Sequence, residues 1–305
     1  MAYAFLSSVT DGVLGYTDGV PIVPSDPGSS YAGYGYSLAV GDLDLTTPGM
    51  EVVVGSAGGG SGKKAVLPKV FLFRWTGSGL AQYSAIANSA GGFGASVAIG
   101  DVVGDGNLDL IVGAWTAGLY VYPGPPSAGN YFTLGSETHV GYRATVANVD
   151  GGLYHDLVGS TDWNAAAIQA DVFSGLVGAG QPAAISLTPA PGLSGGWSTG
   201  MIGHGDINND GLADVLIGAP NAPATTLCPP GSDSVGAAYL FLTNETSPTQ
   251  PVRYVLRSPS LDPDFAGYGW SVAIADGTGI FLVADHARNI GTVADAGQVY
   301  VYRVN

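Results

Sequence analysis

The chain has 305 residues and a net charge of −15, with only nine Lys and Arg residues in total. With so few cations to pair with phosphates, we expect neither nucleic acid nor an anionic membrane as a partner, and we expect no membrane insertion. Forty-nine glycines and nineteen prolines are scattered along the chain, and no helical periodicity persists. This composition favours a single domain built from many short strands.

The first predicted element is a strand over residues 2–9, followed by a loop rich in Gly, Pro and Asp to about residue 30. One pattern then occurs five times: an aromatic residue beside glycine, a short apolar strand, an acidic loop and a second strand. The copies cover residues 33–57, 92–115, 141–161, 195–220 and 267–286. The loops begin at Asp42, Asp101, Asn148, Asp206 and Asp276, at intervals of 47 to 70 residues. Each interval is long enough for four short strands.

Four-stranded units at this spacing predict an all-β fold, a single β-propeller of five blades, with six blades as the alternative. Third strands are expected at residues 70–75, 118–122, 237–242 and 298–303, and fourth strands at 82–87, 131–134, 184–187 and 253–256. The blades would cover residues 31–89, 90–139, 140–194, 195–263, and 264–305 plus 1–10. The last copy ends after its third strand, so residues 2–9 are expected to complete that blade and to close the ring without an open edge.

The fourth copy contains the clearest chemical motif, GDINNDGLADVLIGAP at residues 205–220. Alternate side chains with oxygen atoms, followed by glycine, suit a loop around Ca²⁺, which takes six to eight oxygen ligands. An EF-hand would place Glu at the twelfth position, where this chain has Ile217 in a short β-branched run. We therefore expect a structural calcium site between two strands, with these ligands: Asp206, Asn208, Asp210, the carbonyl of Leu212, and Asp214.

The second copy has a related but incomplete loop. Asp101, Asp105 and Asp109 match the motif, whereas Val103 stands at the third ligand position. A weakened calcium site is therefore expected in blade two. Blade five has Asp276 without later carboxylates and is expected to bind no metal.

Blades one and three leave two alternatives open. Blade one offers Asp42, Asp44 and Thr46 with an out-of-register Glu51, and blade three offers Asn148, Asp150 and Asp156 without a central carboxylate, which Gly152 replaces. Such residues either bind metal or simply make good turns.

The repeated aromatic-Gly, Asp-x-Asn-x-Asp-Gly-x-x-Asp and Gly-Ala-Pro elements resemble the FG-GAP repeats of integrin α-subunit heads. They are also similar to the propeller of glycosylphosphatidylinositol-specific phospholipase D. The resemblance covers residues 31–305, and only the fourth copy matches the pattern in full. It implies a propeller used for adhesion or sugar binding, or occasionally for catalysis. It also implies that ligands bind the face opposite the calcium loops.

Loops that follow the second strand of each blade should lie on that opposite face. They contain the candidate ligand-binding residues Trp115, Asp162, Trp163 and His286. The three rings occupy near-equivalent positions and are expected to converge near the axis, where aromatic platforms beside acidic groups suit a sugar or a flat apolar ligand. Simple packing across the central channel is the alternative.

The sequence thus predicts a calcium-stabilised lectin or adhesion protein that recognises a glycan or a protein. The alternative is a cofactor-independent cyclase or pericyclase with an aromatic pocket for a small apolar ligand, because catalysis by positioning needs no motif. The single cysteine, Cys228, cannot form an internal disulfide, and residues 1–8 do not resemble a signal peptide. Since free calcium is scarce in the cytosol, we expect a secreted or extracellular protein.

Overall fold

The computed structural model describes residues 2–4, 7–10, 13–16, 20–25, 33–47, 49–58, 67–76, 79–135, 140–161, 169–189, 201–222, 236–258, 267–293 and 295–304, with only the backbone before Ile22. These residues form strands and turns, and no helix among them is long and apolar enough to span a membrane.

Five antiparallel sheets, which we call blades one to five, follow one another along the chain. Blade one contains β5 (Tyr34–Gly41), β6 (Glu51–Ser56), β7 (Lys69–Trp75) and β8 (Leu80–Ala87). Blade two contains β9 (Ser96–Gly100), β10 (Asp109–Ala114), β11 (Gly118–Tyr122) and β12 (Phe132–Leu134). Blade three contains β13 (Arg143–Ala147), β14 (Asp156–Ser160), β15 (Ala170–Phe173) and β16 (Ile185–Leu187).

Blade four contains β17 (Ile202–Gly205), β18 (Asp214–Ala219), β19 (Ala237–Leu242) and β20 (Val252–Arg257). Blade five has three strands among the described residues: β21 (Tyr268–Ala275), β22 (Ile280–Asp285) and β23 (Gln298–Arg303). The third and fourth strands expected from the sequence are therefore present, with boundaries within two residues of the expected ones.

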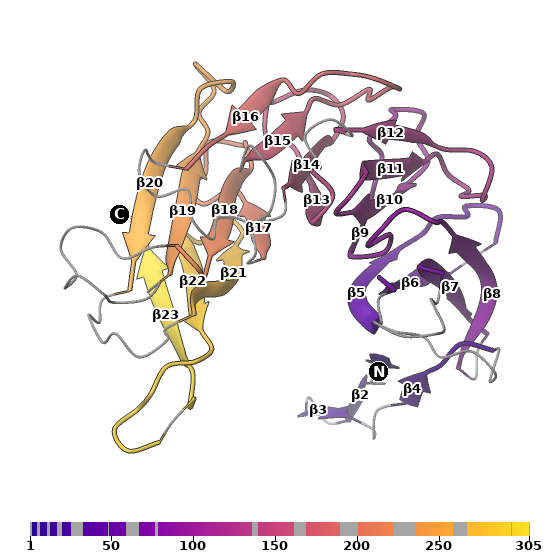
Figure 1. Ribbon diagram of the computed structural model, residues 1–305, viewed down its shortest axis with the longest axis horizontal. Helices are drawn as coiled ribbons and strands as arrows, with labels where there is room; N and C mark the ends of the chain where they lie inside the picture. Colours follow the sequence, from indigo (N-terminus) through magenta and orange to yellow (C-terminus); the bar gives the residue numbers. More distant parts are fainter. Residues whose placement is uncertain are drawn as a thin grey trace.

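The blades form a β-propeller arrangement. They follow one another around an arc, with the first strand of each blade on the inner side (Figure 1). Second strands such as β10 are completely buried, because each lies inside its own sheet and between neighbouring blades. After Asp109, β10 is therefore a continuous apolar run, whereas the outer strand β8 alternates between partly buried and exposed residues, as expected for a strand with one solvated face.

The hydrophobic core is divided between consecutive blades. One cluster joins Val53 and Leu72 of blade one to Leu110 and Val112 of blade two. Three further clusters join blades two and three, three and four, and four and five in the same way. Each sheet therefore buries its faces against its neighbours, which is how a propeller stabilises sheets that could not fold alone.

The N-terminal segment differs from the sequence expectation. Instead of one strand over residues 2–9, β1 (Ala2–Ala4) pairs with β4 (Val20–Ile22), and β2 (Ser7–Thr10) pairs with β3 (Val13–Tyr16). Ile22 packs on Phe71 and Phe73 of blade one, so this segment contacts the first blade. Pairing between neighbouring strands closes a shorter loop than pairing with β23 would. The loss of chain entropy on loop closure is therefore smaller. The number of blades and the closure of the ring remain predictions.

Candidate functional site

All five acidic loops join the first strand of a blade to the second, so they lie at one end of the blades, which we call the loop end. In blade four, Asp206 accepts hydrogen bonds from the backbone N–H groups of Asp210 and Gly211, at 3.1 and 2.8 Å. The side-chain oxygen of Asn208 accepts a second bond from the N–H of Asp210, also at 3.1 Å. The backbone N–H of Asp210 thus donates to both side chains, and the oxygens of Asp206 and Asn208 lie on the same side of the loop.

The backbone of this loop curls tightly. Asn209 and Gly211 have positive φ angles of 59° and 88°, a conformation that Asn and Gly adopt more readily than other residues. The curl turns Asp210 back toward Asn208, whose amide nitrogen donates to the Asp210 carboxylate at 3.0 Å. Three side chains with oxygen atoms therefore line the inside of one short loop.

Asp214 has a different environment because it is fully buried at the start of β18. One carboxylate oxygen accepts the N–H of Ile207 at 2.9 Å, and the other accepts the N–H and the hydroxyl of Thr243 at 2.9 and 3.1 Å. Burial raises the pKa of Asp214 to about 6, against the lowering effect of these hydrogen bonds. Asp214 therefore ties the acidic loop to the segment after the third strand.

The same buried carboxylate recurs in blades two and three. Asp109 accepts the N–H groups of Val102 and Gly124, and Asp156 accepts those of Val149 and Gly175. Both side chains are fully buried, and burial raises the pKa of each. This connection was not predicted from the sequence, where the motif indicates metal binding for Asp109 and Asp214.

The donor set of blade four suits a calcium ion. Asp206, Asn208, Asp210 and the Leu212 carbonyl offer hard oxygen atoms, the type that Ca²⁺ prefers, within one curled loop. Within the described ranges, however, no three His, Cys, Asp or Glu side chains are assembled as a ready-made metal group. The loop carboxylates instead hold backbone N–H groups, so calcium binding remains a proposal based on the chemistry and curl of the loop.

Blade two copies the curl of blade four. Asp101 accepts the N–H groups of Gly104 and Gly106, and Asp105 accepts that of Asn107. Val103 leaves the third position without a side-chain oxygen, as expected from the sequence. The blade-two loop therefore offers one ligand fewer than the blade-four loop.

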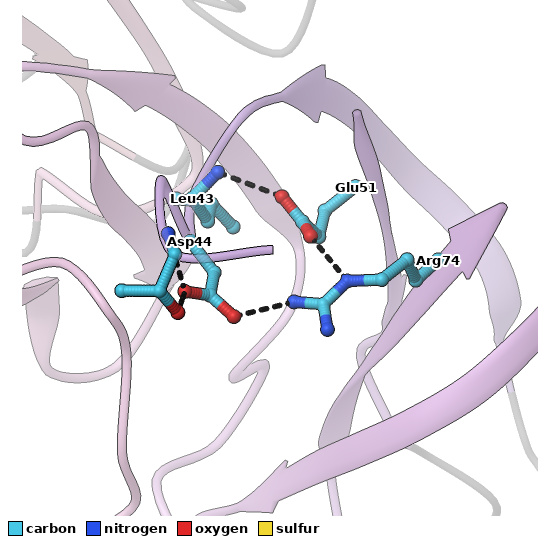
Figure 2. A network of polar contacts seen from close by, with 5 residues as sticks. Leu43, Asp44, Glu51 and Arg74 are labelled. Atoms are coloured by element: carbon cyan, nitrogen blue, oxygen red, sulfur yellow. Dashed lines mark hydrogen bonds and ion pairs between the residues drawn. The ribbon is translucent and has the colours of Figure 1, made fainter. Parts of the chain in front are cut away.

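Blade one supplies a positive charge from its own chain. The Arg74 guanidinium on β7 lies between Asp44 and Glu51, with N–O distances of 2.8 and 2.7 Å (Figure 2). The second oxygen of Glu51 accepts the N–H of Leu43 at 2.8 Å. Hydrogen bonds from Thr46, and then from Arg74, hold the pKa of Asp44 below its usual value.

Glu51 is therefore in register, contrary to the sequence analysis. It pairs with Gly41 across the strands as Asp214 pairs with Gly205, and it is fully buried in the same way. The blade-one loop is one residue longer, and the additional methylene of Glu spans the difference.

The opposite end of the blades, which we call the far end, contains Trp115 and His286. Trp115 follows β10 directly, and its ring lies where a Cβ atom added to Gly92 would be. His286 follows β22 directly, and its ring lies where a Cβ atom added to Gly267 would be. Both glycines precede the first strand of their blade. The two rings therefore occupy equivalent places in their blades, and their role in ligand binding stays a prediction. Asp162 and Trp163 lie outside the described residues.

Trp115 belongs to a cluster of side chains from three blades that no local sequence pattern predicts. Its ring lies 6.4 Å from that of Tyr36 on β5 and 6.3 Å from that of Tyr142, which precedes β13. The Arg143 guanidinium lies 5.5 Å from the Tyr36 ring and 4.6 Å from the Tyr142 ring. We call Tyr36, Trp115, Tyr142 and Arg143 the aromatic–arginine cluster.

A second pair of rings lies at the same end of blade five. Trp270 on β21 is half-exposed, at 49%, and its ring centroid is 4.2 Å from that of His286. Trp270 and Tyr36 both follow an aromatic residue and a glycine at the start of a first strand. This repetition of the aromatic–glycine motif was the sequence signal that could have revealed them.

Comparisons with known proteins agree with this fold. The FG-GAP repeat model matches residues 202–241, which contain the curled loop together with β17, β18 and most of β19. Integrin alpha-IIb of Mus musculus is 27% identical over 253 residues, a match that covers 72% of this chain and 23% of the relative. The chain thus spans about a quarter of the length of that relative. It carries an FG-GAP repeat in blade four and is similar to an integrin α-subunit over most of its length.

Proposed function

We propose that this protein is an adhesion-type binding propeller, with calcium at its loop end and a glycan or protein ligand at its far end. The observation that carries the proposal is the aromatic–arginine cluster at the end opposite the acidic loops. Tyr36 exposes 43% of its surface within this cluster, so it presents an aromatic face that a ligand can cover. Aromatic faces combined with a polar tip suit recognition surfaces.

The similarity to integrin alpha-IIb supports a binding role, and it favours a secreted or extracellular location. Calcium fits the same proposal, because an ion that binds only the folded loop stabilises the propeller. Blade four would bind the ion through Asp206, Asn208, Asp210, Leu212 and Asp214. Blade two would bind a second ion more weakly through Asp101, Asp105 and Asp109.

An array of glycans and extracellular proteins, probed in the presence of calcium, tests the proposed function. The wild-type protein should bind at least one class of ligand, and replacing Trp115 and Trp163 by Ala should reduce binding at least tenfold with little change in melting temperature. Trp75→Ala is the matched control, because Trp75 is an exposed tryptophan at the end of β7 that leads to the loop end. Loss of stability in the double variant would instead identify the tryptophans as core.

The alternative, a cofactor-independent enzyme, is favoured by one residue. Asp285 is fully buried at the end of β22 beside His286, and burial raises its pKa. A carboxyl group with a raised pKa near aromatic rings can donate or accept a proton in catalysis. Turnover of a small apolar substrate that is lost in Asp285→Asn would support this function over binding.

A further inference from the structure

Arg143 has unusual surroundings for a cation in this protein. Its guanidinium is packed between two tyrosine rings, and its Nη1 donates a single hydrogen bond of 3.3 Å, to the carbonyl of Ala95. The Nε atom is buried and has no hydrogen-bond partner. Since a guanidinium carries five N–H donors, most of the donor capacity of Arg143 is unused within the described part of the chain.

A comparison with Arg74 shows what Arg143 lacks. Arg74 also lies beside a tyrosine ring, 4.5 Å from the centroid of Tyr83, but it forms ion pairs with Asp44 and Glu51. Among the described residues, no acidic side chain forms an ion pair with Arg143. A partly buried cation without an anion is unfavourable unless another group compensates its charge.

The surroundings of Arg143 indicate the type of group that would fit. Carboxylates match the planar fork of a guanidinium and form short, charge-assisted hydrogen bonds with it. The exposed face of Tyr36 lies beside that fork and can stack on the apolar C–H face of a sugar ring. The whole chain has a net charge of −15 and therefore repels acidic ligands over most of its surface. A cation such as Arg143 would attract an acidic ligand to its own position.

We propose that the aromatic–arginine cluster binds a carboxylated glycan, with the carboxylate on Arg143 and a sugar ring against Tyr36 and Trp115. This proposal rests on the proposed binding function and specifies its ligand class. An acidic peptide would offer the same carboxylate, but its flexible aliphatic chain makes less use of the two aromatic faces. The proposal therefore commits to an acidic sugar.

Titration calorimetry with an oligogalacturonate and with the same oligosaccharide after reduction of its carboxyl groups tests the proposal. The wild-type protein should bind the acidic form, and reduction should weaken binding at least tenfold. Arg143→Gln should also weaken binding of the acidic form at least tenfold, and Arg143→Lys should restore only part of it, because lysine keeps the charge but not the planar fork. Arg253→Gln, on the outer strand β20, is the matched control and should bind as the wild type does.

Melting temperatures of the Arg143 variants separate a loss of binding from a loss of folding. Equal binding of the acidic and reduced sugars, or undiminished binding by a folded Arg143→Gln, would overturn the proposal and leave the binding function intact. Binding of a poly-glutamate peptide but not of the sugar would also overturn it. If the protein binds neither these probes nor any ligand on the array, both proposals fail together.

Discussion

Blades one and four build related loops that differ in the side chain facing the buried carboxylate. In blade one, the Arg74 guanidinium compensates Asp44 and the buried Glu51 (Figure 2). In blade four, Val215 pairs with Phe241, so the next residue, Leu242, stands at the position that Arg74 has in blade one. Among the described residues, no cation takes this place. Asp206, Asn208 and Asp210 line that loop instead. We therefore propose that the same arrangement of a buried carboxylate and an acidic loop, which we call the carboxylate framework, binds an internal arginine in blade one and a calcium ion in blade four.

The largest effect should come from breaking the internal pair. Glu51→Ala would leave Arg74 without its closest anion and the buried N–H of Leu43 without an acceptor. Removing one partner of a buried ion pair costs about 3 kcal/mol or more. Urea denaturation should show this loss with and without calcium, and Glu51→Gln, which keeps an acceptor for the N–H, should lose less. Equal stability of Glu51→Ala and the wild type would contradict the structural role.

Removing calcium should act on blade four and not on blade one. An ion present at a hundred times its dissociation constant stabilises the folded state by about 2.7 kcal/mol. A chelator should therefore lower the melting temperature of the wild type and have less effect on Asp210→Ala. Metal analysis should show one calcium fewer in Asp210→Ala and no change in the control Asp44→Ala. Unchanged calcium content in Asp210→Ala would contradict the blade-four site.

Much of this comparison was accessible from the sequence, because it depends on local patterns. The strands of blade four were predicted from short β-branched runs, and its loop from the alternation of Asp206, Asn208 and Asp210. Glu51 was predicted to be out of register because the blade-one loop is one residue longer than the blade-four loop. The longer side chain of Glu compensates for this additional residue. Arg74 could not be identified, because it lies 30 residues from Asp44 and only the strand register brings the two together.

The far end of the blades was predicted less completely for the same reason. Trp115 and His286 follow second strands directly, so their place was fixed by counting along the chain. Tyr36 and Arg143 belong to different blades, and only the packing of β5, β9 and β13 around the arc brings them together (Figure 1). No local pattern predicts such a contact.

An intermediate effect should follow when blade one is made to resemble blade four. Arg74→Leu removes the internal cation and introduces the residue that blade four has at this position, Leu242. Asp42 has a buried oxygen without a hydrogen-bond partner, and it would join Asp44 and Glu51 as a possible calcium ligand. The variant should lose about 1–3 kcal/mol in chelator, less than Glu51→Ala, because Asp44 and Glu51 lose a charged partner but the buried N–H of Leu43 keeps its acceptor.

Millimolar calcium should restore part of that stability, and the calcium content should rise by one ion. Arg74→Lys is the control, because it keeps a positive charge at this place and should gain no calcium. If Arg74→Leu loses stability and calcium restores none of it, an arginine and a calcium ion are not interchangeable in this framework.

The smallest effect should come from Asp44, the outer partner of Arg74. Its side chain is about one-fifth exposed, whereas that of Glu51 is fully buried, so water and salt already compensate part of its charge. Ion pairs with access to solvent contribute about 1 kcal/mol or less. Asp44→Asn keeps an oxygen atom for the Thr46 hydrogen bonds and removes only the charge. It should therefore cost less stability than any of the other changes, and this cost should shrink further as salt rises from about 0.05 to about 0.5 M. A loss as large as that of Glu51→Ala would mean that both carboxylates compensate Arg74 equally, and that burial does not rank them.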